Sequence, residues 1–265
     1  MSGTLIKYYK SNDKQVSIVC GRGISKRFPM HRHRSVSVGM VINGMRLLNI
    51  NSKRYIVDQG DIFIINADQP HAIGENTNPE HDYIVVSLSQ KLIEKYLEPD
   101  NLQFENIVES KTLSAKLKNW FEVLIHSEKE LHRSFDTENF IMSLADFQKA
   151  ENQIETENIN IQRIRHLLDR DLNVNHSLES LAEKAFLSPF HFSRLFRKQT
   201  GLAPHQYLLD NRLRQARELL EQNFSIIDIA IECGFYDASH FIRHFTKYYG
   251  VSPLTYQKGI GHLPV

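Results

Sequence analysis

Two stretches decide the fold of the C-terminal part of the chain: SPFHFSRLFRKQTGLAPHQY at residues 188–207 and DASHFIRHFTKYYGVSPLTY at residues 237–256. At an offset of 49 residues, the second stretch repeats the His, Phe, Arg, Phe, Lys, Gly, Pro and Tyr of the first. A repeat of this length at one fixed offset predicts two copies of one structural unit.

Each copy predicts a helix, a short turn and a second helix. In the first copy Ser188 is placed to cap the second helix, and Pro189 suits its first position, where no amide hydrogen is needed. Gly201 is placed to end that helix. Asp237 and Gly250 hold the matching positions in the second copy. This is the plan of a DNA-reading helix-turn-helix, and a helix at about 205–222 is expected to join the two units.

The outer face of the second helix in each unit is predicted to contact DNA. Its residues are Phe190, Ser193, Arg194, Arg197 and Lys198 in the first unit and Ala238, Ser239, Ile242, Arg243, His244 and Lys247 in the second. Arg194 and Arg243 suit bidentate contact with guanine, whereas the other basic side chains suit phosphates. Phe190, Ala238 and Ile242 could meet thymine methyl groups. For any single arginine, the alternative is a surface salt bridge.

The distribution of charge supports a phosphate-facing surface, although the net charge of +1 does not. No acidic residue occurs from Lys184 to Leu209, and none follows Asp237. A solvated helix face more often mixes both signs.

The composition indicates a globular protein of the cytoplasm. With 265 residues, the chain is long enough for two domains, and 41% apolar and 24% charged residues are ordinary values. No run of about 20 apolar residues could cross a membrane, and the first residues lack the apolar core of a signal peptide. The two cysteines, Cys20 and Cys233, fall in different predicted domains and do not form a disulfide framework.

The first half alternates short apolar runs with turn signals and is predicted to form a small antiparallel β-barrel or sandwich over 15–90. From residue 90 the apolar period becomes helical. We therefore expect an α+β chain with three parts: a β-barrel at 1–90, a helical dimerisation or linker region at 91–152 and a DNA-binding domain at 158–258.

The duplicated region resembles the DNA-binding domain of the AraC/XylS transcription regulators over roughly 160–258. The resemblance implies two helix-turn-helix units that enter adjacent major grooves, with base contacts at the positions of Arg194 and Arg243. It also implies promoter DNA and RNA polymerase as partners, activation as the commoner effect, and no enzymatic activity. Gln257 departs from the family pattern, which usually has arginine after the tyrosine.

The stretch from His31 to His71 resembles the cupin-like regulatory domain of the same family. The shared features are HRH at 31–33, Gly44, Tyr55, QGD at 59–61 and IINADQPH at 64–71. This resemblance implies a barrel that accepts a small-molecule effector. The candidate pocket residues are His31, His33, Arg46, Asn66, His71 and His81.

A metal site is the alternative interpretation of three of these histidines. His31 and His33 are one residue apart, so both face one side of a strand, and His71 could complete a set of ligands. This would suit a cupin-type metal-dependent enzyme or a metal sensor fused to a DNA-binding domain. The first acidic residue after His33 is Asp58, beyond a hairpin, so the carboxylate ligand of enzymatic cupins is missing. We therefore expect no metal and no cofactor.

A helical stripe at 111–125 leaves two alternatives open. Leu113, Leu117, Trp120 and Leu124 recur at helical spacing. They could pack on their own barrel or form the seam of a homodimer, which the family resemblance favours.

Overall fold

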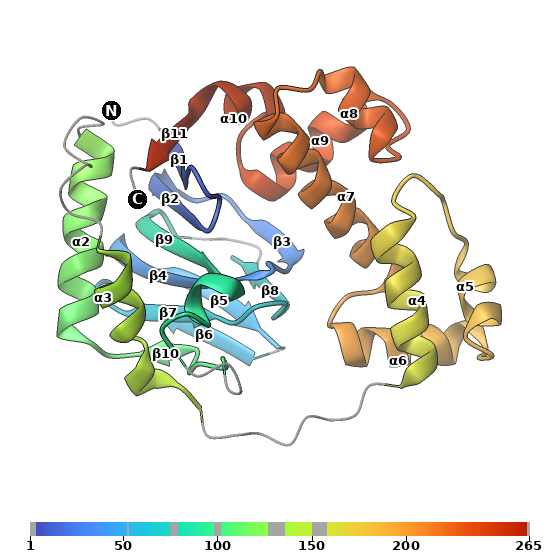
Figure 1. Ribbon diagram of the computed structural model, residues 1–265, viewed down its shortest axis with the longest axis horizontal. Coiled ribbons are helices and arrows are strands. Elements are labelled where there is room, and N and C mark those ends of the chain that lie inside the picture. The colour runs from blue at the N-terminus through green and yellow to red at the C-terminus, as the bar shows by residue number, and fades with distance from the viewer. Residues whose placement is uncertain are drawn as a thin grey trace. The chain divides into compact units, whose positions relative to one another are not determined.

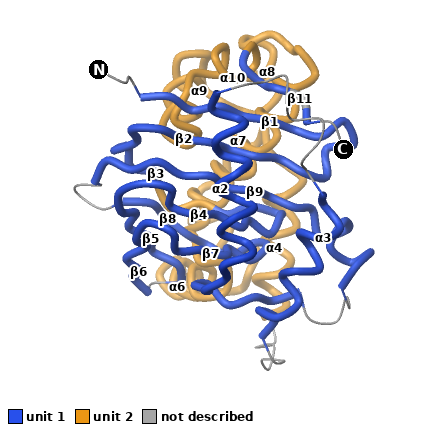
Figure 2. The backbone as a smooth tube through the Cα atoms, turned by 90° about the vertical axis from the view of Figure 1, so that its left-hand side faces the viewer, with its two compact units in different colours: residues 1–28, 32–152, 259–265 blue, residues 29–31, 153–258 orange. Residues whose placement is uncertain are grey.

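The computed structural model describes residues 4–51, 53–74, 79–97, 102–126, 136–149 and 158–263, and it divides into two compact units (Figures 1 and 2). The first unit comprises residues 1–28, 32–152 and 259–265, and the second comprises 29–31 and 153–258. Strands dominate the first unit and helices the second, which confirms the predicted α+β class.

Two sheets contain the described strands, and all of these strands except β3, whose residues 29–31 are grouped with the second unit, belong to the first unit. The larger has the strand order β10-β7-β4-β9-β2-β1-β11 and the smaller β3-β8-β5-β6. The strands are β1 (Leu5–Ser11), β2 (Val16–Ile24), β3 (Phe28–His31), β4 (Ser35–Gly44), β5 (Arg46–Ile50), β6 (Lys53–Val57), β7 (Ile62–Ile65), β8 (His71–Ile73), β9 (His81–Ser89), β10 (Ile107–Val108) and β11 (Ile260–Leu263). Strand β11 pairs in parallel with β1, from Tyr8 opposite Ile260 to Ser11 opposite Leu263.

The larger sheet is buried on both faces. In β7, Ile62 and Ile64 belong to an apolar core shared with helices, while Phe63 and Ile65 belong to a second core shared with the smaller sheet. The four consecutive apolar residues of β7 follow from this, because neither side of the strand meets water. The second core therefore occupies the interior between the two sheets.

Helices cover the outer face of the larger sheet. They are α1 (Gln90–Ile93), α2 (Lys111–His126), α3 (Thr137–Met142) and the 3-10 helix η3 (Ala145–Phe147). The stripe of α2 is buried in the core it shares with the strands: Leu113, Leu117 and Leu124 have no exposed surface and Trp120 is 3% exposed. These four side chains therefore pack on the strands of their own chain, as the first of the two alternatives expects, and a homodimer stays a prediction. Their apolar stripe is explained by the sheet alone.

Seven helices follow in the second unit. They are α4 (Ile159–Arg170), α5 (Leu178–Lys184), α6 (Pro189–Thr200), α7 (Pro204–Glu221), α8 (Ile226–Glu232), α9 (Ala238–Tyr249) and α10 (Pro253–Gly259). The predicted ends of α6 and α9 are confirmed. Ser188 and Asp237 accept hydrogen bonds from the backbone amides of His191 and His240, and Gly201 and Gly250 adopt the left-handed conformation that stops each helix.

The repeated phenylalanines form the apolar centre of each helix-turn-helix. Phe192 and Phe196 on α6, and Phe241 and Phe245 on α9, are completely buried. Leu195, which lies between Phe192 and Phe196 at helical spacing, is only half-buried.

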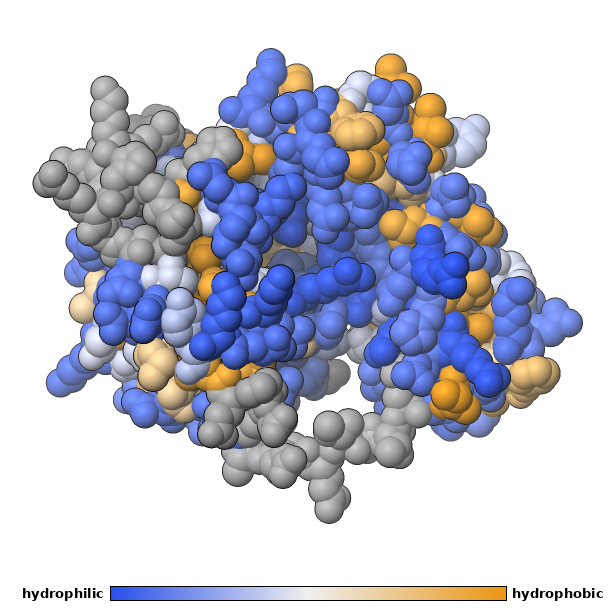
Figure 3. All heavy atoms as spheres, in the orientation of Figure 1, coloured by the Kyte–Doolittle hydropathy of each residue, from blue (hydrophilic) through white to orange (hydrophobic). Residues whose placement is uncertain are grey.

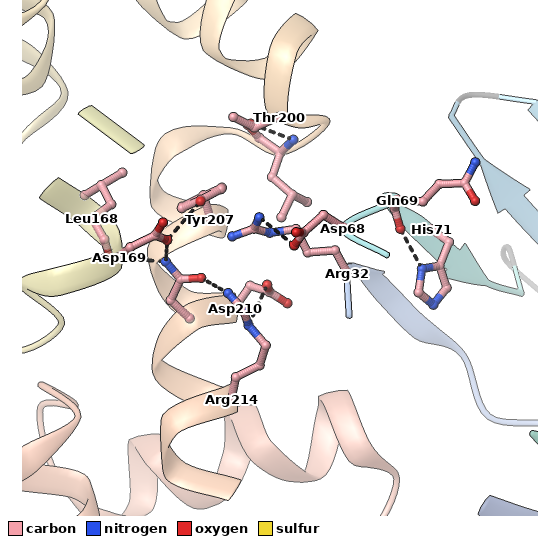
Figure 4. A network of polar contacts seen from close by, with 12 residues as sticks. Arg32, Asp68, Gln69, His71, Leu168, Asp169, Thr200, Tyr207, Asp210 and Arg214 are labelled. Carbon is pink, nitrogen blue, oxygen red and sulfur yellow. Dashed lines mark hydrogen bonds and ion pairs between the residues drawn. The ribbon is translucent and has the colours of Figure 1, made fainter. Parts of the chain in front are cut away.

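Both copies of the repeat also make an equivalent hydrogen bond to the helix that precedes each helix-turn-helix. Tyr207 on α7 donates a hydrogen bond of 2.9 Å to Asp169 on α4, and Tyr256 on α10 donates one of 3.1 Å to Glu221 on α7. Figure 4 shows Asp169 between Tyr207 and the neighbouring turn of α7. Helix α7 therefore has two structural roles: it closes the first half of the unit and opens the second.

Gln257 also stabilises this junction. Its side-chain amide donates hydrogen bonds of 3.2 Å to the carbonyl of Leu220 and 3.1 Å to that of Phe224. These carbonyls lie at the end of α7 and just beyond it, where backbone acceptors need partners. The departure from the family pattern at this position thus has a structural use.

Gly234 joins the two halves of the helical unit. It lies in the turn between α8 and α9 with φ of +72°. A Cβ atom at this position would lie 2.6 Å from Cα of Asn173 and 2.7 Å from the carbonyl oxygen of Leu172, in the loop between α4 and α5. The second turn therefore packs directly against the backbone of the first half, and only glycine fits.

Candidate nucleic-acid interface and effector site

The predicted DNA-contacting residues of α6 lie on its solvent side. Phe190 is 78% exposed, and Arg194, Arg197 and Lys198 are exposed as well. Ser193 is half-buried. Because Phe192 and Phe196 hold the opposite side of α6 in the core, these side chains share one accessible face.

Helix α9 presents an equivalent face. Ser239, Ile242, Arg243 and Lys247 are exposed, whereas Ala238 and His244 are half-buried. Burial, followed by the nearby His240, lowers the pKa of His244. A lowered pKa leaves this imidazole neutral at physiological pH, so its predicted contact with phosphate would be a hydrogen bond rather than an ion pair.

The arginines of both helices make no ion pair within the described residues. Arg194, Arg197 and Arg243 have neither a salt bridge nor a side-chain hydrogen bond there, and the same holds for Lys247. The surface salt bridge, the alternative for any single arginine, is thus not formed in this part of the chain. Within the described residues, Arg194, Arg197, Arg243 and Lys247 thus keep their positive charge uncompensated, as a phosphate-binding surface requires.

Exposed aromatic side chains accompany both helices, and the sequence did not single them out. Phe186 is 82% exposed and lies in the turn before α6, while Tyr236 is 93% exposed and lies in the turn before α9. Exposed apolar side chains are frequent in the helical unit, and Figure 3 shows hydrophobic patches among its hydrophilic surface. Both aromatic residues lie outside the helical spacing of the buried side chains, and this position in the sequence could have identified them as exposed.

The three histidines proposed for the pocket or a metal lie at or near strand ends, and His33 follows β3 by two residues rather than belonging to a strand. His31 ends β3 and His71 begins β8, its neighbour in the sheet. Ring nitrogens of His31, His33 and His71 all lie within 4.8 Å of one another. Nδ1 of His31 donates to the carbonyl of Pro29 at 2.7 Å, and Nδ1 of His71 donates to that of Gln69 at 3.1 Å (Figure 4). A hydrogen bond from Nδ1 to a carbonyl is also a common way to orient imidazoles that bind a metal.

Asn66 has a structural role. It is 1% exposed, its Oδ1 accepts a hydrogen bond of 2.7 Å from the amide of Phe104, and its Nδ2 donates one of 3.0 Å to the carbonyl of the same residue. Both ends of the amide are therefore occupied in fixing the segment around Phe104. This makes Asn66 a poor ligand for an effector.

Arg46 and His81 lie together at the end of the interior between the sheets. They are 2% and 1% exposed. The guanidinium carbon of Arg46 lies 4.1 Å from the ring centre of Tyr83 and 5.2 Å from that of Phe63. Burial lowers the pKa of Arg46 to about 10, so it stays charged at neutral pH. Burial, followed by the charge of Arg46, lowers the pKa of His81 to about 4, so that ring is neutral.

None of the described helices is long and apolar enough to cross a membrane. Cys20 and Cys233 are both buried and unpaired with each other.

Comparisons with known proteins match both units. A family model described as a helix-turn-helix domain matches residues 181–259, and one described as an AraC-like ligand binding domain matches residues 16–145. The uncharacterised HTH-type transcriptional regulator YbfI of Bacillus subtilis is 27% identical over 230 residues, covering 83% of each chain. The HTH-type transcriptional activator RhaR of Pectobacterium carotovorum is 27% identical over 285 residues, covering 94% of this chain and 93% of the relative.

A solved structure shares the overall fold. ToxT from Vibrio cholerae superimposes with a TM-score of 0.55 over 97% of this chain and 96% of its own, at 13% sequence identity. At this identity the likeness concerns the fold alone.

Proposed function

Because this chain belongs to the AraC/XylS family of helix-turn-helix transcription regulators, we propose that it is a transcription activator controlled by a small molecule bound in its AraC-like domain. Members of this family bind DNA and regulate transcription rather than catalyse reactions. Activation is supported by RhaR, a relative that is named an activator. RNA polymerase at the promoter is then the expected protein partner, and the cytoplasm the place of action.

One observation carries the DNA-reading part of the proposal: two equivalent helices, whose arginines form no ion pair with other described residues, stand on one compact unit. Helix α7 contributes 18 residues between them, a length of about 27 Å at 1.5 Å per residue. This is of the order of one turn of DNA, about 34 Å. Arg194 on α6 and Arg243 on α9 are therefore proposed to read bases in successive stretches of the major groove.

We further propose that the protein acts as a homodimer. A single chain offers few basic contacts on each recognition helix, and joining two chains raises affinity through effective concentration. The surface that pairs them must lie outside the buried stripe of α2.

A metal ion as the sensed signal is a second candidate, favoured by the cluster of His31, His33 and His71. Neutral imidazoles that donate through Nδ1 to a carbonyl are ordinary ligands through Nε2. Metal analysis of the purified protein tests this candidate. A stoichiometric metal that His71→Ala removes would support it, and its absence after incubation with zinc, iron and manganese would exclude it.

The experiment that tests DNA reading compares two substitutions on one helix. Binding sites are first selected from genomic fragments and footprinted. Arg243→Ala is expected to weaken the selected site by about 1–3 kcal/mol and to relax the preference at one base position. Lys247→Ala is expected to weaken all sequences alike and to reduce the salt slope by about one.

Two results would contradict the proposal. One is that Arg243→Ala weakens binding to the selected site and to random DNA equally. The other is a footprint that protects no pair of adjoining grooves. Arg194→Ala supplies the same test for α6, and its effect should map to a different stretch of the site.

A further inference from the structure

Arg46 is a buried cation that forms no ion pair with any other described residue. Among the described residues its Nε and Nη1 atoms have no hydrogen-bond partner, although the side chain is 2% exposed. These two atoms carry most of the N–H donors of the guanidinium. An unpaired buried charge costs several kcal/mol of stability, so a structure that retains one without a partner requires an explanation.

The aromatic neighbours offset part of this cost. Tyr83 and Phe63 offer ring faces to the guanidinium at 4.1 Å and 5.2 Å. Such cation–π contacts stabilise a cation that has lost its water. They attract the positive charge, but they do not accept hydrogen bonds in the plane of the guanidinium, so Nε and Nη1 remain without an acceptor among the described residues.

The packing around these rings is built to hold them in place. A Cβ atom on Gly39 of β4 would lie 2.2 Å from the Phe63 ring, and one on Gly21 of β2 would lie 2.3 Å from the Tyr83 ring. Glycine in both strands therefore lets the aromatic rings lie flat against the sheet, beside Arg46. The guanidinium is held by a preformed frame rather than by a flexible surface.

A hydrogen-bond acceptor lies in the same corner. Strand register places His81 opposite Gly44, two residues before Arg46. Nδ1 of His81 donates to the carbonyl of Pro79 at 2.8 Å, which leaves Nε2 as an acceptor, and this buried atom has no partner among the described residues. The corner thus offers unsatisfied donors on Arg46 and one unsatisfied acceptor on His81.

We propose that Arg46 binds the carboxylate of a small organic acid that enters the interior between the two sheets. Either edge of a guanidinium that a carboxylate engages contains Nε or Nη1, the two atoms that lack partners here. Nε2 of His81 then accepts a hydrogen bond from a hydroxyl on the same acid. The proposal rests on the function proposed above, since it names the chemical class of the effector.

The test uses the full-length protein and a set of matched probes. Acetate, lactate, benzoate, mandelate and octanoate are each compared with their neutral amides at constant ionic strength, by thermal shift and by calorimetry. At least one acid is expected to raise the melting temperature more than its amide does, because a ligand that binds the folded state stabilises it by linkage.

Substitutions assign the effect to the proposed residue. Arg46→Met keeps the length of the side chain and removes its charge, and it should weaken binding of the preferred acid about tenfold or more. Without ligand, Arg46→Met should melt no lower than the native protein, because it removes an unpaired buried charge. Arg34→Met, at an exposed arginine of the same unit, is the control and should change neither property.

Each opposite result overturns the proposal. If no acid surpasses its amide, or if Arg46→Met keeps the preference, Arg46 is not a carboxylate site. If Arg46→Met lowers the melting temperature and the acids do not bind, Arg46 is a structural element of the sheet interior. DNA binding measured on the same preparations separates this outcome from failure of the proposed function, because the helical unit does not depend on Arg46.

Discussion

Gly234 provides the most direct test of how the two helix-turn-helix units are held together. In Gly234→Ala, the new Cβ atom would meet Cα of Asn173 at 2.6 Å and the carbonyl oxygen of Leu172 at 2.7 Å. Both are backbone atoms, so no side-chain rotation relieves the overlap. Overpacking of this kind costs about 1–3 kcal/mol, and a left-handed backbone costs alanine about 1–2 kcal/mol more. We expect a loss of about 2–5 kcal/mol in the stability of the helical unit.

Gly60 supplies the matched control. Its φ of +91° is also left-handed, but a Cβ atom there would meet nothing within 4 Å. Gly60→Ala should therefore cost only the backbone strain, about 1–2 kcal/mol. The difference between the two substitutions measures the contact between the halves.

The assay follows denaturant unfolding with two signals. Trp120, the single tryptophan, lies in the first unit, so its fluorescence reports that unit. Far-UV circular dichroism is dominated by helices and follows the second unit. Gly234→Ala should shift the dichroism transition and leave the fluorescence transition in place. Equal effects of the two substitutions, each on its own unit, would refute the packing argument.

Three further outcomes are expected. Folded His81 has its pKa lowered to about 4, so the free energy of unfolding should fall as the pH drops below about 6.5, where the unfolded imidazole takes up a proton and the folded one does not. The loss should approach about 3 kcal/mol near pH 4. Unfolding of wild type and of His81→Gln, followed by Trp120 fluorescence over this pH range, should differ by this amount. Tyr256→Phe should cost about 1 kcal/mol in dichroism-monitored unfolding, because Glu221 loses a hydrogen bond, and a change no larger than experimental error would show that the bond is not formed in solution. His71→Ala should retain DNA affinity without effector and alter the response to it, whereas loss of DNA affinity in gel-shift titrations would argue against a sensing role.

The features that could be predicted from the sequence are those encoded locally. The caps at Ser188 and Asp237 and the glycine stops at Gly201 and Gly250 depend on a few adjacent residues, and all four are confirmed. The buried phenylalanines follow from helical spacing in the same way. Because the phenylalanines face the core, Arg194 and Arg243 on the other side of the same helices face outward. Their contacts with DNA remain a prediction.

Features that depend on distant partners could not be predicted. Strand β1 was missed because its neighbours are β2 and β11, and the short segment of β11 contains a glycine and too few residues to show alternation. The apolar stripe of α2 could pack on the sheet of its own chain or on a second chain. The sequence alone does not distinguish the two, whereas the structure shows the packing on the sheet. Arg46 was one pocket candidate among six, because the sequence does not show that its charge meets no counter-ion among the described residues.

The pairing of β11 with β1 makes the helical unit an insertion rather than an appendage. The chain leaves the first unit near residue 152, forms the helices, and returns at Gly259 to add a strand directly after α10. During synthesis the edge of β1 therefore stays uncovered until the whole helical unit has emerged, and an uncovered edge can recruit other strands. Production of the isolated first unit should for this reason include residues 260–263, joined through a short linker, to keep that edge paired.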